Sequence, residues 1–132
     1  MSDPVIIVQN AIEQGLGVTA WPVQLPDAPE FPCVVVTLAG GRDEYDTDGD
    51  TGLLEARVQV DVYAEGYAAC VALKEQVRQF LVGRNPIPGP ACAINAAMCN
   101  IDTDLPAPEF RRAGPQGVRR RMLDFTIWTR RA

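Results

Sequence analysis

The chain contains no histidine among its 132 residues, and this absence removes the commonest general base in enzymes. Neither a Ser-His nor a Cys-His nucleophilic pair can be built without it. A zinc site is also disfavoured, because the sequence has no C-x-x-C motif as well as no imidazole ligand. The sequence therefore predicts a protein that is not an enzyme, with no catalytic residue, no bound cofactor and no metal site.

Long hydrophobic runs are also missing. No apolar run approaches the roughly 18 residues that a membrane-spanning helix needs. The first residues, M-S-D-P-V-I-I-V, lack the basic start and the small-residue cleavage site of a signal peptide. With 47% hydrophobic and 22% charged residues, we expect one soluble globular domain over residues 1–132 that stays in the compartment where it is made.

The four cysteines do not form a disulfide pattern. Each lies inside an apolar run, the spacings are wide, and no secretion signal accompanies them. We therefore expect buried, reduced thiols at Cys33, Cys70, Cys92 and Cys99.

The net charge of −5 is unevenly distributed along the chain. After residue 110 the chain has seven basic residues and one acidic residue, Asp124, so this part has a net charge of +6. The preceding part has five basic and sixteen acidic residues, which gives −11. Such asymmetry is typical of nucleic-acid binding, or of a surface that meets a copy of itself with an acidic patch against a basic one.

The hydrophobic pattern predicts the order α-β-β-β-α-β-β. One helix starts at Asp3 and Pro4 and ends at Gly15 and Gly17. A second spans Tyr67 to about Val82, with Lys74 on the polar side opposite its apolar stripe. The strands are expected at residues 21–25, 33–39, 54–63, 91–101 and 118–129, and the third of them alternates strictly between apolar and polar positions. We predict an α+β domain in which two helices pack on one face of a mainly antiparallel sheet.

The stretch E-Y-D-T-D-G-D-T-G-L-L-E, residues 44–55, is similar to a calcium loop, with alternate acidic positions, a sixth Gly and a twelfth Glu. An EF-hand needs helices on both sides, whereas both flanks here are strand-like. The favoured interpretation is a long β-hairpin whose tip, at about residues 40–52, is acidic and solvated.

Other polar motifs indicate little chemistry. Arg119 and Arg121 should point to the opposite face from Arg120, and no aromatic residues interleave with them to stack bases, so direct nucleic-acid binding is disfavoured. Asp102 and Asp104 lie beside a proline-rich loop and are expected to be solvated surface residues.

The segment R-V-Q-V-D-V-Y-A-E-G-Y-A-A-C-V-A-L-K-E-Q-V-R-Q-F-L resembles a signature of bacteriophage tail completion proteins, also called tail terminators or head–tail joining proteins. That signature is an arginine-led strand ending in a Q-V-D-like segment, a short A-x-x-Y joint and an amphipathic helix closing on a leucine. W-P-V-Q-L-P-D-A-P-E-F-P-C-V-V-V and the closing R-R-R-M-L-D-F-T-I-W-T are also similar to this family.

The resemblance implies a structural protein of the virion, assembled in the host cytoplasm. Family members form a ring, typically a hexamer, at the head-proximal end of the tail tube. The ring stops tube polymerisation and presents a surface to the head-closure (connector) proteins of the neck, while DNA passes through its channel without sequence-specific binding. The tail tube protein is the partner on the other side.

From the charge asymmetry we hypothesise contacts between subunits or between adjoining rings. The residues proposed for these contacts are Asp43, Glu44, Asp46, Asp48, Asp50, Arg111, Arg112, Arg119, Arg120 and Arg121. The alternatives are another neck or minor tail component, such as a head-closure protein, or a small non-phage module that binds calcium or nucleic acid. A thiol enzyme ranks last, because no histidine could assist the cysteine.

Overall fold

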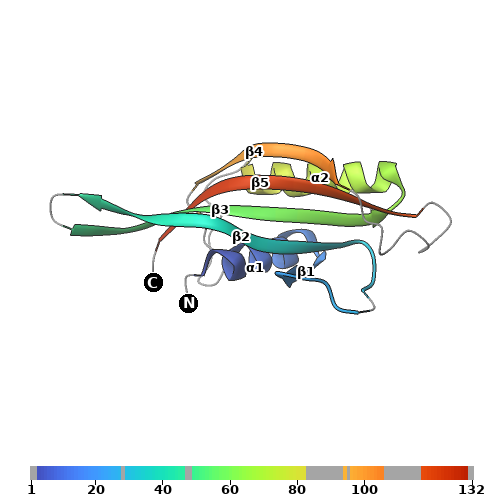
Figure 1. The fold of residues 1–132 in the computed structure, drawn as a ribbon, viewed down its shortest axis with the longest axis horizontal. Helices are drawn as coiled ribbons and strands as arrows, with labels where there is room; N and C mark the ends of the chain where they lie inside the picture. The colour runs from blue at the N-terminus through green and yellow to red at the C-terminus, as the bar shows by residue number, and fades with distance from the viewer. Residues whose placement is uncertain are drawn as a thin grey trace.

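The computed structural model describes residues 3–27, 29–46, 49–82, 94, 96–105 and 117–130, with the backbone alone for residues 42–46, 49–53 and 130. The described elements, shown in Figure 1, are α1 (Pro4–Leu16), β1 (Thr19–Pro22), β2 (Cys33–Asp46), β3 (Gly49–Glu65), α2 (Tyr67–Val82), β4 (Ala96–Leu105) and β5 (Val118–Arg130). This order confirms the α-β-β-β-α-β-β prediction.

Helix α1 has a side-chain cap at its start and a glycine cap at its end. Asp3 Oδ1 accepts hydrogen bonds from the backbone N–H groups of Val5 and Ile6 at 2.9 and 3.2 Å. Gly17 adopts the left-handed conformation with φ 68°, which glycine tolerates without a Cβ clash. Gly15 was expected to help end this helix, but it lies inside it. A Cβ added there would lie 2.2 Å from Cζ of Phe80, so this glycine permits α1 to pack against α2.

The five strands form one sheet in the order β1-β2-β3-β5-β4. The β1–β2 pair is parallel and the other pairs are antiparallel. Strand β2 is buried on both faces at its start, where Val34 and Val36 point one way and Cys33 and Val35 the other. Strand β2 is therefore an inner strand over this part of its length.

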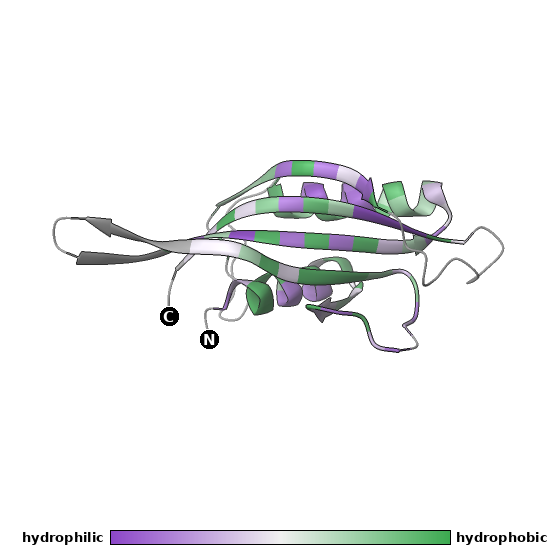
Figure 2. Ribbon diagram, viewed as in Figure 1, coloured by the Kyte–Doolittle hydropathy of each residue, from purple (hydrophilic) through white to green (hydrophobic). Residues whose placement is uncertain are grey.

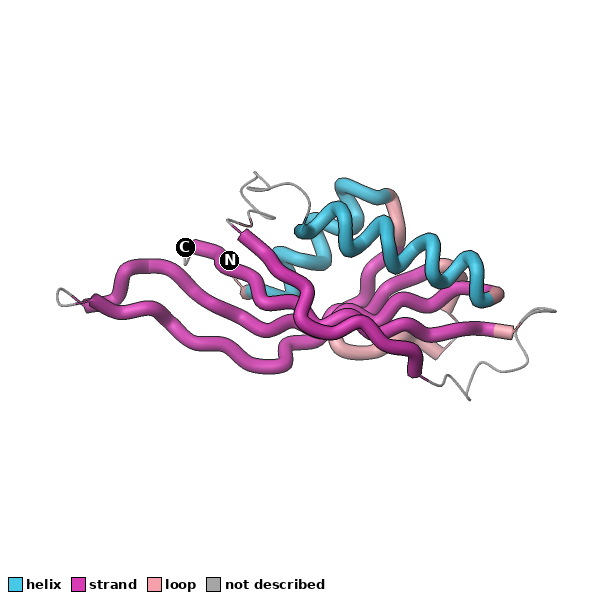
Figure 3. Tube along the Cα trace, turned by 90° about the horizontal axis from the view of Figure 1, so that it is seen from above, coloured by secondary structure: helices cyan, strands magenta, loops and turns pink. Residues whose placement is uncertain are grey.

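Both helices lie on the same face of the sheet (Figure 3). Helix α1 contacts β1 and β2, while α2 contacts β3, β5 and β4. The alternation along β3, visible in Figure 2, directs Val58, Val60 and Val62 into the core beneath the helices. We call the opposite side of the sheet the helix-free face.

The ends of several strands differ from the sequence prediction. Strand β1 spans Thr19–Pro22 instead of residues 21–25, and β4 spans Ala96–Leu105 instead of residues 91–101. Pro22 offers no N–H for further pairing, which suits the end of a strand. The β2–β3 register continues to the pair Asp46 and Gly49, so the paired ribbon is longer than expected and extends beyond the other strands (Figure 1).

The burial of Leu73 yields a test of the core. Leu73 is 6% exposed and belongs to the main hydrophobic cluster, so Leu73→Ala should lower the free energy of unfolding by about 2–5 kcal/mol. Chemical denaturation measures this change. Gln76→Ala, at an exposed position on the same helix, is the matched control and should change the free energy of unfolding by less than about 0.5 kcal/mol. Equal effects of the two substitutions would contradict the packing of α2 described here.

Candidate functional site

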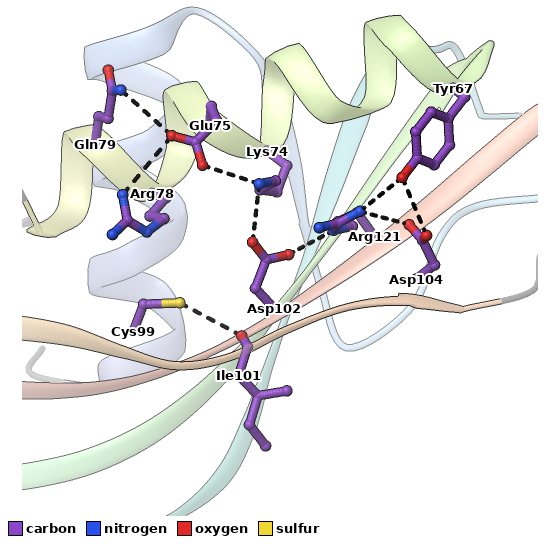
Figure 4. Close-up of polar contacts among 10 residues, drawn as sticks. All are labelled: Tyr67, Lys74, Glu75, Arg78, Gln79, Cys99, Ile101, Asp102, Asp104 and Arg121. Atoms are coloured by element: carbon purple, nitrogen blue, oxygen red, sulfur yellow. Dashed lines mark hydrogen bonds and ion pairs between the residues drawn. The ribbon is translucent and has the colours of Figure 1, made fainter.

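A buried lysine lies at the centre of a polar cluster between α2 and the β4–β5 side of the sheet. The Lys74 side chain is 8% exposed, and its Nζ lies 2.9 Å from Asp102 Oδ2 and 3.0 Å from Glu75 Oε1 (Figure 4). Burial by itself would lower the pKa of Lys74, but the hydrogen bonds to Asp102 and Glu75 outweigh it and raise the pKa. The amine therefore stays charged.

Arg121 extends this cluster to β5. Its Nε lies 2.6 Å from Asp102 Oδ1, and one terminal nitrogen lies 2.9 Å from Asp104 Oδ1 and 3.3 Å from the Tyr67 hydroxyl. Burial would raise the pKa of Asp102, but hydrogen bonds from Arg121 and Lys74 lower it below its ordinary value. The α2 cluster, as we call Tyr67, Lys74, Asp102, Asp104 and Arg121, thus connects α2, β4 and β5 through one shared carboxylate.

The helix-free face carries a second set of ion pairs. Arg57 and Asp124 approach to 2.6 Å across β3 and β5, and the side chain of Asp124 is only 8% exposed. Arg120 Nε lies 3.1 Å from Asp61 Oδ1, and Gln59 Nε2 donates to the other oxygen of Asp61 at 2.9 Å. Each nearly buried carboxylate on this face therefore has a cationic partner from the neighbouring strand.

Two open grooves flank these clusters. One, of about 540 Å³, lies on the helix-free face and is lined in part by Val35, Asp61, Tyr63 and Arg120. The other, of about 450 Å³, lies beside α2 and has mainly apolar walls that include Leu73. In the first groove the charged groups Asp61 and Arg120 are engaged with each other, and Asp27 adds an exposed carboxylate to its wall.

The cysteines in the described part are free, and two of them are buried. Burial raises the pKa of the Cys33 thiol to about 11, and it also raises the pKa of Cys70. Thiols that remain protonated are weak nucleophiles. The expectation of buried reduced cysteines is confirmed for these two positions. Cys99 is half-buried, and Cys92 lies outside the described residues.

Two further kinds of site have no support in the described part of the chain. No group of three or more histidine, cysteine, aspartate or glutamate side chains there could hold a metal ion. None of the helices described is long and apolar enough to cross a membrane. The flanks of the acidic stretch are strands, where an EF-hand would need helices.

The predicted contact residues lie at two ends of the sheet. Asp43, Glu44 and Asp46 end β2 and Asp50 is near the start of β3, whereas Asp48, Arg111 and Arg112 lie outside the described residues. The stretch Arg119 to Arg121 pairs with the far end of β3. Among the described members, the acidic and basic residues therefore lie at opposite ends of β3.

The three arginines of β5 differ in their surroundings. Arg119 is exposed and Arg121 joins the α2 cluster on the helix side, while Arg120 pairs with Asp61 on the helix-free face. The predicted alternation of these side chains is confirmed. The proposal that they contact a neighbouring copy stays a prediction.

The sequence interpretation was wrong about Lys74 and Asp102. Lys74 was expected on the polar side of α2, and Asp102 in a solvated segment. The signal was present, because Lys74 follows Cys70 by four residues and precedes Val77 by three, which places it on the buried stripe. Nothing in the sequence pattern showed that Asp102 would lie opposite it.

The α2 cluster gives a second test, with a control in the same strand. Asp102→Asn removes the charge that Lys74 and Arg121 share, leaving the buried amine with Glu75 alone, and should lower the free energy of unfolding by about 1–3 kcal/mol. Asp104→Asn removes the charge of a side chain that is 57% exposed and should lower the free energy of unfolding by less than about 1 kcal/mol. Chemical denaturation of both variants compares them, and an equal loss would contradict the central place of Asp102.

Acid pH tests the same carboxylate. Because the pKa of Asp102 is lower in the folded chain than in the unfolded chain, its contribution to stability is complete above about pH 4. The contribution is lost as the pH falls through the folded-state pKa. Asp102→Asn should therefore flatten the decline in the free energy of unfolding below about pH 4, as measured by denaturation at a series of pH values. An unchanged decline would mean that other carboxylates account for the acid sensitivity.

Comparisons with known proteins agree on a viral assembly fold. A chain in the virion of a native gene transfer agent particle has a similar structure, with a TM-score of 0.53 and 18% sequence identity over 98% of this chain and 87% of that one. No curated protein matches this chain. The family model for tail completion protein gp17 matches residues 9–130. The chain therefore belongs to the tail completion protein gp17 family and is a structural protein of the bacteriophage tail.

Proposed function

We propose that this chain is the subunit of a homo-oligomeric ring, a hexamer, that terminates the phage tail tube and joins it to the head-closure proteins of the neck. The observation that carries the proposal is the family match, which spans nearly the whole domain. The role is mechanical and not enzymatic, and the α2 cluster serves to fix α2 on the sheet. The ring assembles in the host cytoplasm and remains in the virion.

The structural neighbour supports an assembly role. That chain is part of a virion particle, and its fold covers almost all of this chain. A ring requires head-to-tail contacts, in which one surface of a subunit meets a different surface of the next. The uneven charge of the chain favours such contacts over face-to-face pairing of like surfaces.

The positions of the acidic and basic residues refine the proposed contacts. The acidic stretch lies at the start of the 17-residue strand β3, and Arg119 to Arg121 lie at its other end, roughly 50 Å away at strand spacing. In a ring whose strands run along the channel axis, all subunits lie at the same height. The acidic ribbon of one subunit therefore cannot meet Arg119 to Arg121 of its neighbour, and it would extend beyond its own ring. We therefore assign the contact of residues 43–50 to the adjoining ring of the tail or neck.

The helix-free face suits a channel wall. Its cations Arg57 and Arg120 are each paired with an aspartate of the same chain, so they are not free to hold phosphates. DNA would then pass without being retained. We propose that this face points to the channel and the helices point outwards.

The acidic ribbon supplies the test of this function. Asp46→Lys/Asp48→Lys/Asp50→Lys should leave the domain folded and the ring formed, but it should reduce the yield of joined particles because repulsion replaces attraction at the adjoining ring. Mass photometry measures the ring, and electron microscopy counts joined heads and tails after complementation of a phage that lacks the protein.

A triple variant with the same change in net charge is the control. Asp27→Lys/Glu30→Lys/Glu65→Lys alters exposed carboxylates outside the ribbon and should preserve joining. If the ribbon variant joins particles as well as the parent protein, the ribbon has no role in assembly. If the parent protein forms no oligomer at any salt concentration, the ring proposal itself fails.

A further inference from the structure

Both edges of the five-stranded sheet carry strand backbone that no described strand pairs with. At one edge β4 pairs only with β5, so the other side of its backbone is open within the described part of the chain. At the opposite edge β1 pairs with β2 only over residues 33–36, which leaves residues 37–46 of β2 open. An open edge is a template for pairing with another strand.

The two open edges run in opposite directions and lie at the same level. Each neighbouring pair from β2 through β3 and β5 to β4 is antiparallel, so β2 and β4 have opposite directions. Thr37 pairs with Gln59, Gln59 with Asp124, and Asp124 with Ile101. These four residues therefore lie at the same level along the strand direction. The open part of β2 therefore begins level with the middle of β4.

The edge of β4 exposes large apolar side chains where edge strands are usually protected by charge or proline. Met98 is 50% exposed and Ile101 is 43% exposed, and both lie on the helix-free face, opposite Thr126 and Asp124. On β2, a Cβ added to Gly40 would meet nothing within 4 Å, so the backbone there has open space beside it. Exposed apolar groups of this kind mark contact surfaces.

Each edge also contains an irregularity in the pairing. The register shifts between Leu38 and Gly40 on β2 and between Cys99 and Ile101 on β4. Leu38 and Cys99 are level with each other through Val58 and Phe125. Bulges bend a sheet and increase its twist, and they are common where sheets curve into barrels.

We infer that the open edge of β4 in one copy pairs antiparallel with residues 37–42 of β2 in the next copy, so that one sheet continues from subunit to subunit. This inference rests on the proposed ring. Rotation about an axis that runs along the strands leaves the direction of every strand unchanged. Because β2 and β4 have opposite directions within one copy, β4 of one copy is also antiparallel to β2 of the next. Because different edges meet, the contact is heterologous and can close into a ring.

A second copy fits these edges better than a foreign strand does. One chain carries both members of the pair, with matching level and opposite direction. A foreign strand would satisfy one edge and leave the other open. In a closed ring, pairing between copies places the exposed side chains of Met98 and Ile101 at an interface in every subunit.

Engineered disulfides test the pairing. In a background of Cys92→Ser/Cys99→Ser, Thr37→Cys is combined in turn with Met98→Cys, Ile101→Cys and Thr103→Cys. These three positions on β4 all lie on the helix-free face, as Thr37 does. Each would be opposite Thr37 in a different register between the copies, so the three pairs test three registers. Within one chain, Thr37 and Ile101 are three strand spacings apart, roughly 14 Å, which is too far for a disulfide.

Mild oxidation should give at least one of these variants a ladder of covalent multimers on a non-reducing gel. Gln59→Cys with Ile101→Cys is the control, because Gln59 is at the same level and on the same face but in the central strand β3. This control should give no ladder. Rings seen by mass photometry without a ladder from any of the three variants would overturn the edge pairing while leaving the proposed function intact.

A charge substitution provides a second readout that needs no oxidation. Met98→Lys/Ile101→Lys should convert rings into monomers at a concentration where the parent protein forms rings, without changing the circular dichroism spectrum. Ile6→Lys, at an apolar position on α1 that is 36% exposed, is the control and should keep the rings. Intact rings of the double variant contradict edge pairing, and a parent protein that stays monomeric contradicts both the pairing and the ring.

Discussion

The alternation along β3 is the constraint on which the rest of the structure depends. This strand lies in the middle of the sheet, with β2 on one side and β5 on the other. Its valines all point to one face, so both helices must cover that face to bury them. The other face of β3 carries polar side chains, and at one end Cys33, Val35 and Tyr63 pack there in a second, smaller hydrophobic cluster. A one-residue shift in register would exchange these faces, which makes the arrangement strongly specified.

Charged residues are buried on both sides of this sheet, and the two sides pair these charges differently. On the helix side, one carboxylate at Asp102 serves both Lys74 and Arg121, so three elements are joined at one point. On the helix-free face, Asp61 and Asp124 are each paired with an arginine of the neighbouring strand. Buried charges without partners are costly, so these pairs fix the relative positions of the strands more than they add to stability.

The function follows from what the fold leaves exposed. The described residues form no catalytic arrangement, and the thiols of Cys33 and Cys70 are buried with raised pKa values. What remains available is a long two-stranded ribbon, an uncovered sheet face and two open edges of opposite direction. The proposed contacts with other copies and with the adjoining ring use these features, and the chain belongs to the tail completion protein gp17 family.

The sequence by itself determined the two helices, the order of the elements and the faces of β3, because hydrophobic periodicity and caps such as Asp3 and Gly17 act locally. It also carried the family resemblance. The position of Lys74 on the buried stripe of α2 could be read from the spacing, but only the tertiary structure decided that Asp102 lies in a strand opposite it. The partners of that cluster are far apart in the chain, so no local pattern could reveal their contact. For the same reason the level and direction of the two open edges depend on strand order, which the sequence pattern does not specify.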